Sequence, residues 1–167
     1  MGLTAAAAQG LGLHLQVCRD CGTHQYPPRE ACGHCLSERL VWQAQSGGGV
    51  LLAQTTLRHS HDLYFKERLP WRIGTIQLDV GPTVVAFLTD RVAESPCRVR
   101  VSPRLDRAGE AVLIAQPDDD ITMDPNERIQ LETGCNPKGR NVLVSDGKTA
   151  VGQALVQALV KEGSTTI

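Results

Sequence analysis

The chain has 167 residues, of which 41% are hydrophobic and 21% charged, and its 17 Lys and Arg residues against 18 Asp and Glu residues give a formal net charge of -1. This composition is that of a globular protein with one or two domains. It argues against a disordered chain and against a polybasic binder of nucleic acid or membrane surfaces. No apolar run reaches the ~20 residues of a membrane-spanning helix. Because the N-terminal residues also lack the basic start and long apolar centre of a secretory signal, we expect a cytoplasmic protein.

Two paired cysteine motifs dominate the N-terminal part of the chain. Each has the form C-x2-C, and ten residues separate them. The four residues are Cys18, Cys21, Cys32 and Cys35. Zinc suits such a set because the ion is soft enough for sulfur, redox-inert and satisfied by four ligands. Since four thiolates leave no position for water, the predicted metal is structural. Iron in a rubredoxin-like site uses the same four sulfurs and stays an alternative.

The residues around these motifs refine the expectation. Two disulfides are disfavoured because no secretory signal precedes the cysteines. Gly22 follows the first motif, where a positive φ lets backbone N–H groups turn toward the sulfurs, whereas Leu36 follows the second. We therefore expect this turn at the first motif only. Cys97 and Cys135 stand alone in the sequence, and buried free thiols are the expectation for both.

From residue 40 onward the sequence predicts a small β-barrel. Short apolar and β-branched runs alternate with turn residues. The expected strands are Val41–Ala44, Val50–Leu57, Arg72–Leu78, Thr83–Leu88, Arg98–Val101 and Ala111–Ala115. The expected turns are a glycine-rich turn at Ser46–Gly49, a hairpin at Asp79–Pro82 and a turn at Asp106–Gly109. Five or six short strands with no intervening helix favour a mainly β fold, with an OB-type barrel of five strands.

The remaining residues change character twice. Residues 117–140 are rich in Asp, Pro and Gly, and their apolar residues follow neither the helical nor the strand period. They are therefore expected to be a linker. Asn141–Ser145 is then expected to be a strand, Thr149–Glu162 a helix closed by Gly163, and Ser164–Ile167 the beginning of another strand. Such an element is one open βα unit of Rossmann type. Because a nucleotide-binding fold needs several parallel strands, we expect the sequence to be part of a longer polypeptide.

The predicted organisation has five segments. They are an N-terminal segment at 1–12, a zinc ribbon at 13–40, an OB-fold barrel at 41–116, a linker at 117–140 and a partial Rossmann-like βα unit at 141–167.

Three stretches of the chain together resemble a known family. They are CRDCGTHQYPPREACGHCLSERLVW, the SGGGV turn and the WRIGTIQLDVGP strand and turn. The chain up to residue 115 resembles the zinc-ribbon plus OB-fold proteins known as domain of unknown function 35 (DUF35). The resemblance implies a rubredoxin-like ribbon and a small, non-catalytic partner of thiolase-like enzymes. In that family the ribbon and barrel dock on the thiolase and contribute to its acyl-CoA channel. Gly48 stands where arginine is common in the family, which puts any anion contact of that arginine in doubt.

A second resemblance concerns residues 139–165, which look like the start of a short-chain dehydrogenase/reductase. Against that family's Thr-Gly-x-x-x-Gly-x-Gly turn, this chain places Ser145, Asp146, Ala150 and Gly152, with Gly147 one place after the first glycine. The resemblance implies Gly147 and Gly152 as residues that approach NAD(P), and only in a longer chain. Asp146 would bring a carboxylate near the phosphates, so a degenerate unit that packs without cofactor stays an alternative.

These observations leave three functions to compare. The first is an accessory subunit that docks on a thiolase-like enzyme, with residues 58–72 as its suggested surface because they combine cations with Tyr64, Phe65 and Trp71. The second is the N-terminal module of a fused reductase acting on acyl-CoA intermediates. The third is an OB-fold binder of single-stranded nucleic acid, which the near-zero charge and few aromatics disfavour. Two histidines at this spacing, His59 and His61, are poor evidence for catalysis by themselves, so no catalytic residue is predicted.

Overall fold

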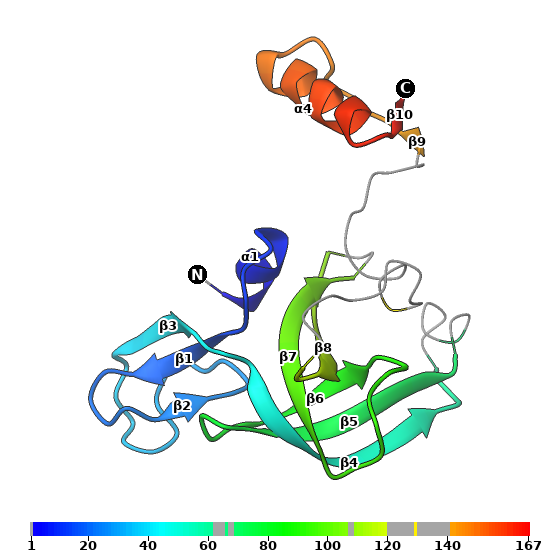
Figure 1. Cartoon of the computed structure of the whole chain (residues 1–167). Helices are drawn as coiled ribbons and strands as arrows, with labels where there is room; N and C mark the ends of the chain where they lie inside the picture. The colour runs from blue at the N-terminus through cyan, green and yellow to red at the C-terminus, as the bar shows by residue number, and fades with distance from the viewer. Residues whose placement is uncertain (1, 62–65, 67–68, 107–108, 120–128, 130–140) are drawn as a thin grey trace. The chain divides into compact units, whose positions relative to one another are not determined.

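The computed structural model describes residues 2–61, 66, 69–106, 109–119, 129 and 141–167 (Figure 1). The chain divides into two compact units, Met1–Gly134 and Cys135–Ile167, which are described separately here. Within the described ranges, no helix has the length and hydrophobicity that crossing a membrane requires.

The N-terminal unit begins with a small antiparallel sheet that forms the ribbon. Its strands are β1 (His14–Cys18), β2 (His24–Gln25) and β3 (Leu40–Ala44), in the order β2-β1-β3. Gln16 lies opposite Gln25 on one side and opposite Trp42 on the other. Alternate residues of β1 point to opposite faces, so Leu15 and Val17 are buried together. This sheet carries the first cysteine motif at the end of β1.

Five further strands close into a barrel, which confirms the predicted mainly β fold (Figure 1). They are β4 (Gly48–Leu57), β5 (Trp71–Leu78), β6 (Thr83–Leu88), β7 (Cys97–Leu105) and β8 (Ala111–Pro117). Their order around the barrel is β4-β5-β6-β8-β7, and β7 pairs with β4 to complete the closure. The inward positions of β6 illustrate the alternation, because Val84, Ala86 and Leu88 are all buried.

Several strands are longer than the sequence predicted. β4 begins at Gly48 rather than Val50 because Gly48 and Gly49 pair with Arg100 and Val99 of β7. The glycine-rich turn at Ser46–Gly49 is therefore shorter than expected. The strand β7 continues to Leu105, well beyond the expected end at Val101, since it pairs with β8 along its length. Tertiary pairing extends these strands past the residues with high strand propensity.

A short N-terminal helix was not predicted from the sequence. Helix α1 (Leu3–Ala8) contacts β7, β8 and β1, and Ala6 in its middle is fully buried. Its alanine run has a high helix propensity. A helix of six residues is not stable alone, so its packing on the barrel stabilises it.

Ribbon and barrel share one hydrophobic core. Leu13 and Leu15 from the ribbon pack in the same cluster as the buried residues of the barrel. The barrel members of this cluster include Leu51, Ile76, Leu78, Leu88, Val99, Val101 and Leu113. The two domains are therefore joined by apolar packing as well as by the chain.

The C-terminal unit is a single βαβ element. Strands β9 (Asn141–Val142) and β10 (Thr165–Thr166) pair in parallel, with α4 (Ala150–Lys161) between them. Thr149 caps the helix, since its hydroxyl accepts a hydrogen bond of 3.1 Å from the Gly152 N–H. The first strand is shorter than the predicted Asn141–Ser145 because only two residue pairs form.

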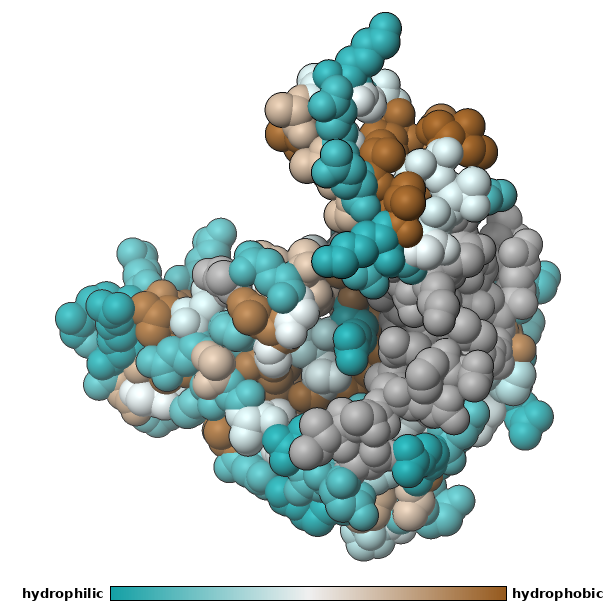
Figure 2. All heavy atoms as spheres, turned by 45° about the horizontal axis from the view of Figure 1, so that its top comes forward, coloured by the Kyte–Doolittle hydropathy of each residue, from teal (hydrophilic) through white to brown (hydrophobic). Residues whose placement is uncertain are grey.

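The apolar side chains of this unit are largely exposed. Leu143 is 76% and Val151 is 79% exposed. In the space-filling view, apolar residues of this unit form part of its surface (Figure 2). Of the residues of α4, only Gly152 is buried. The unit thus presents surface that parallel α/β folds normally cover with further strands and helices.

Candidate functional site

The four cysteines of the two motifs come together at one end of the ribbon. Each motif makes the same turn: Gly22 N donates to Cys18 O at 2.9 Å, and Leu36 N donates to Cys32 O at 3.0 Å. Gly22 has φ +72° and Leu36 has φ +62°. The expectation that only the first motif makes this turn is therefore wrong. A leucine in the left-handed region of backbone conformation costs about 1 kcal/mol. The hydrogen-bonded turn of the second motif holds Leu36 in that conformation.

The sulfur positions fit a tetrahedral metal ion. All four Sγ atoms lie within 4.8 Å of one another. The Cys18–Cys35 and Cys21–Cys32 sulfur pairs are each 3.6 Å apart. Four sulfurs at about 2.3 Å from a zinc ion would be about 3.8 Å from each other, so the observed spacing suits zinc. Cys18 and Cys32 are buried, and Cys21 and Cys35 are exposed.

The crowding of the thiols also favours a cation. The Thr23 hydroxyl, hydrogen-bonded to the Cys21 sulfur at 3.2 Å, lowers the pKa of Cys21 to about 5. At Cys35 the Ser37 backbone lowers the pKa, but the neighbouring Cys21 sulfur, burial and the other two sulfurs outweigh it and raise the pKa to about 12. Thiols this close do not ionise independently, because each thiolate disfavours the next. A divalent ion removes that repulsion and binds all four as thiolates.

Polar side chains connect the two motifs around the cysteines. Asp20, between the cysteines of the first motif, accepts a hydrogen bond from Arg39 Nε at 3.0 Å and another from the Ser37 hydroxyl after the second motif. Gln16 Oε1 accepts bonds from Arg29 N at 2.7 Å and from Gln25 Nε2 at 3.1 Å, which fixes the loop between the motifs. Sequence reasoning missed these residues, since only tertiary placement pairs them.

Only part of the surface predicted at residues 58–72 belongs to the described residues. Tyr64 and Phe65 lie outside them. Trp71 is 8% exposed and its ring lies edge-on to Phe87, with centroids 5.4 Å apart. It therefore packs on the barrel and is not an exposed interface residue. The rings of His59 and His61 lie 5.4 Å apart. Among the described residues, the four cysteines form the only group of three or more His, Cys, Asp or Glu side chains placed to hold a metal.

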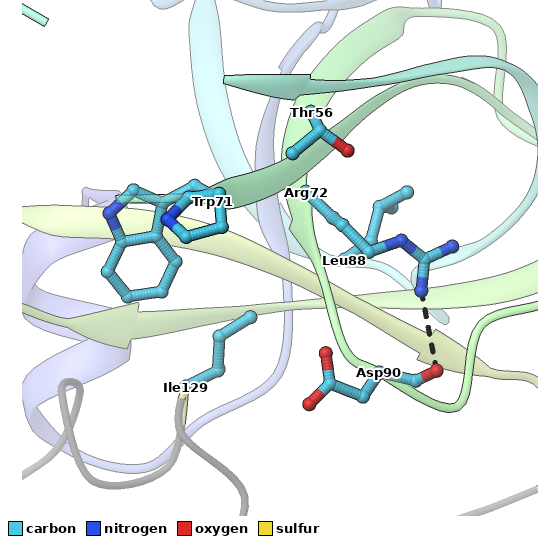
Figure 3. A pocket seen from close by; sticks show the side chains of 7 residues that line it. Thr56, Trp71, Arg72, Leu88, Asp90 and Ile129 are labelled. Carbon is cyan, nitrogen blue, oxygen red and sulfur yellow. Dashed lines mark hydrogen bonds between the residues drawn. The ribbon is translucent and has the colours of Figure 1, made fainter. Parts of the chain in front are cut away.

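A cleft of about 310 Å³ lies beside Trp71 (Figure 3). Trp71 and Ile129 line one side of the cleft, and Arg72 and Asp90 line the other (Figure 3). Ile129, within the predicted linker, is only 5% exposed and packs with Trp71 and Ile114.

Arg72 does not offer its charge to a ligand in this cleft. Its guanidinium donates to the carbonyl oxygens of Thr89, Asp90 and Val92 at 3.2, 3.3 and 2.9 Å. It also donates to Gln54 Oε1 at 2.7 Å. These bonds hold the loop after β6 against the barrel.

Comparison with models of protein families finds two matches in the N-terminal unit, one over the ribbon and one over the barrel. Residues 12–41 match the model described as ChsH2, rubredoxin-like zinc ribbon domain. Residues 42–105 match the model described as ChsH2, C-terminal OB-fold domain. The chain belongs to the ChsH2 (DUF35) family of zinc-ribbon and OB-fold proteins. The four clustered cysteines are thus those of a zinc ribbon, in agreement with the predicted structural zinc.

Two solved structures of related description are similar to the chain. The structure named Ltp2-ChsH2(DUF35) aldolase has 22% identity and a TM-score of 0.56, covering 69% of this chain and 91% of that chain. A protein of unknown function from the DUF35 family of Sulfolobus solfataricus has 16% identity and a TM-score of 0.45, covering 70% of this chain and 82% of that chain. At 22% identity, the likeness to the first of these structures shows the fold alone. No curated protein matches the chain.

The candidate dinucleotide residues lie outside both ChsH2 matches. Gly152 is in the first turn of α4, and a Cβ there would overlap the carbonyl oxygen of Asp146 and lie 3.1 Å from the Cα of Gly147. Only glycine therefore allows the loop before α4 to pack against the helix. The resemblance of this unit to a reductase is not among the matches found.

Proposed function

We propose that the chain is a non-catalytic accessory subunit that docks on a thiolase-like enzyme and helps to form its acyl-CoA site. The observation that carries the proposal is the pair of adjoining ChsH2 domain matches over residues 12–105. The fold is also that of the ChsH2 component named together with Ltp2 in an aldolase structure. The four-cysteine centre supports an accessory role, because a fully ligated zinc ion has no open position for substrate.

The zinc itself is assigned to Cys18, Cys21, Cys32 and Cys35, and its role is to fold the ribbon. A ribbon of three short strands has too little core to be stable alone. Metal binding of this type contributes on the order of 10 kcal/mol to folding. The spacing of the sulfurs supports this assignment, as does the effect of the neighbouring sulfurs on the pKa of Cys35.

The docking proposal is tested by purification from the native host. Tagged chain would be recovered at moderate salt, with the tag alone as control, and co-purifying proteins identified by mass spectrometry. We expect a thiolase-like subunit in near-equal amount. Titration of the complex and of that subunit alone with acetyl-CoA then tests the second part, and we expect tighter binding by the complex. Recovery of nucleic acid, or of no protein, would contradict docking, while equal acetyl-CoA affinities would contradict a role in the acyl-CoA site.

A second candidate function concerns the C-terminal unit. We propose that residues 141–167 begin a dinucleotide-binding domain of a fused reductase, with Gly147 and Gly152 nearest the cofactor. The parallel β9–α4–β10 arrangement and the close approach at Gly152 support it. Titration with NADH and NADPH, followed by nicotinamide fluorescence, is the test. The 167-residue chain should not bind either, and a longer polypeptide that carries it should. Absence of binding by the longer polypeptide would refute the assignment.

A further inference from the structure

The barrel wall has a gap between strands β6 and β8. β6 pairs with β5 from Thr83↔Gln77 to Phe87↔Ile73. Its pairing with β8 is confined to two rungs, Phe87↔Ile114 and Leu88↔Ala115. Residues 83–86 of β6 and 111–113 of β8 therefore have no described ladder between them, although both strands continue there.

The direction of the backbone groups shows what faces this gap. Pro82 O accepts from Leu78 N at 3.0 Å, so the even-numbered residues of this strand point their polar groups toward β5. Thr89 N donates to Ala115 O at 3.0 Å, so the odd-numbered residues point toward β8. Because these directions alternate along a strand, the N–H and C=O of Val85 point into the gap. By the same alternation, the N–H of Leu113 points into it from β8, whereas its carbonyl lies at the end of the Phe87↔Ile114 rung.

The described side chains that line the gap are uncharged and mostly apolar. Val85 is 58% exposed, although it stands on the outer face of the sheet where polar residues are usual. A hollow of about 210 Å³ lies between the strands, lined by Tyr26, Ile73, Val85, Ala86, Phe87, Ala111, Val112 and Leu113. A second hollow of about 170 Å³ lies over β4 and β5; it shares Ile73 and Val85 with the first and is also lined by Gln54, Thr55 and Thr75. We call the first hollow and the facing edges of β6 and β8 the β6–β8 slot.

The neighbouring surface indicates which occupant fits the slot. Ile129 packs with Trp71 and Ile114, with Phe87 and Val112 at the border of the same cluster. Phe87 and Val112 also line the slot. An aliphatic side chain from outside the barrel therefore already packs on the surface next to it. Among the residues that the structure describes, no charged side chain lines either hollow, which disfavours nucleic acid as the occupant.

We propose that the β6–β8 slot binds an extended segment of a partner protein. The segment adds as a short strand beside residues 83–86 of β6, where β8 does not pair with them; its backbone pairs with Val85 and its alternate apolar side chains pack against Val85 and Ile73. This is strand addition to a sheet edge, in which main-chain bonds give affinity and side-chain hollows give specificity. The inference rests on the proposed function in that the partner is the protein on which the ribbon and barrel dock.

The first test uses the full chain and the subunit that co-purifies with it. Val85→Lys places a charge in the slot at an exposed position, and Leu52→Lys, at a residue 52% exposed on β4, is the matched control. We expect Val85→Lys to weaken binding at least about tenfold and Leu52→Lys to leave it within about twofold. Both variants should unfold at the same urea concentration as the wild type. Equal affinity of Val85→Lys and wild type would overturn the proposal.

Amide hydrogen exchange tests the backbone pairing directly. In the free chain the amides of Val85 and Leu113 should exchange quickly, whereas those of Val84 and Ala86, which face β5, should be protected. Binding of the subunit should slow exchange at Val85 at least about tenfold. Protection of Val85 in the free chain at low concentration would show that the chain fills its own slot. Protection that grows with chain concentration would assign the slot to a second copy. Either result would overturn the proposal.

A separate experiment distinguishes failure of the slot from failure of the proposed function. If no subunit co-purifies, the docking function fails, and random twelve-residue peptides displayed on phage would be selected on the immobilised chain. Peptides that bind the wild type and the Leu52→Lys variant but not the Val85→Lys variant would retain the slot as a site for extended segments. Peptides that bind all three equally, or no enrichment, would exclude it.

Discussion

A close approach between Gly47 and the backbone of β7 gives the sharpest stability prediction. Gly47 has φ +75° and lies directly against Val101 of β7, where Val101 N donates to Gly47 O at 2.8 Å. A Cβ at Gly47 would overlap the carbonyl oxygen of Val101 and lie 3.2 Å from its carbon. Gly47→Ala therefore combines left-handed strain of about 1–2 kcal/mol, overpacking of about 1–3 kcal/mol and loss of a hydrogen bond worth about 1 kcal/mol. We expect a loss of about 4 kcal/mol of unfolding free energy.

A second glycine separates strain from overlap. Gly109 has φ +84° in another turn of the barrel, and a Cβ there meets nothing within 4 Å. Gly109→Ala should therefore cost only the strain, about 1–2 kcal/mol. Urea unfolding of the zinc-loaded chain, followed by circular dichroism, measures both variants against the wild type. Equal losses for the two variants would refute the reasoning, since they would mean that Val101 moves away from the new Cβ at no cost.

Three further predictions test the metal, the loop after β6 and the division of the chain. Cys18→Ser should release the zinc and unfold the ribbon, whereas Cys97→Ser should keep both; metal analysis and circular dichroism decide, and stoichiometric zinc in Cys18→Ser would contradict the assignment. Arg72→Lys should lose about 2 kcal/mol in urea unfolding, because an ammonium cannot reach three carbonyls and Gln54 together, and wild-type stability would contradict this role. Deleting Cys135–Ile167 should leave the melting temperature within about 2 °C, and a larger fall would show that the units depend on each other.

The sequence predicted the elements that rest on local pattern. The spacing of the cysteines predicted one four-sulfur site, and the four Sγ atoms lie within 4.8 Å of one another. Alternating apolar residues and turn signals placed β6 at its observed bounds, Thr83–Leu88. Both patterns are local because each depends on residues that are neighbours along the chain.

Other features depend on contacts between distant segments, and the sequence did not reveal them. Helix α1 is stabilised by packing on β7 and β8, so its own six residues could not predict it. Leu36 adopts a positive φ because the hydrogen-bonded turn from Leu36 N to Cys32 O requires it, although leucine does not favour that conformation. Cys97 is half-buried rather than buried, with Ala93 O 3.7 Å from its sulfur, and Cys135 lies outside the described residues. The β6–β8 slot likewise follows from strand order around the barrel.

The metal centre and the slot are connected through the loop between the cysteine motifs. Tyr26 lies between Cys21 and Cys32, packs against the shared core, and lines the 210 Å³ hollow. Leu13 and Leu15 anchor β1 in the barrel core, and Cys18 ends that strand at the metal site. Zinc bound by Cys21 and Cys32 therefore fixes both ends of the loop that carries Tyr26, and the barrel core fixes the start of β1. A ribbon without metal would leave the wall of the slot incomplete, so loss of zinc should weaken partner binding even where the barrel stays folded.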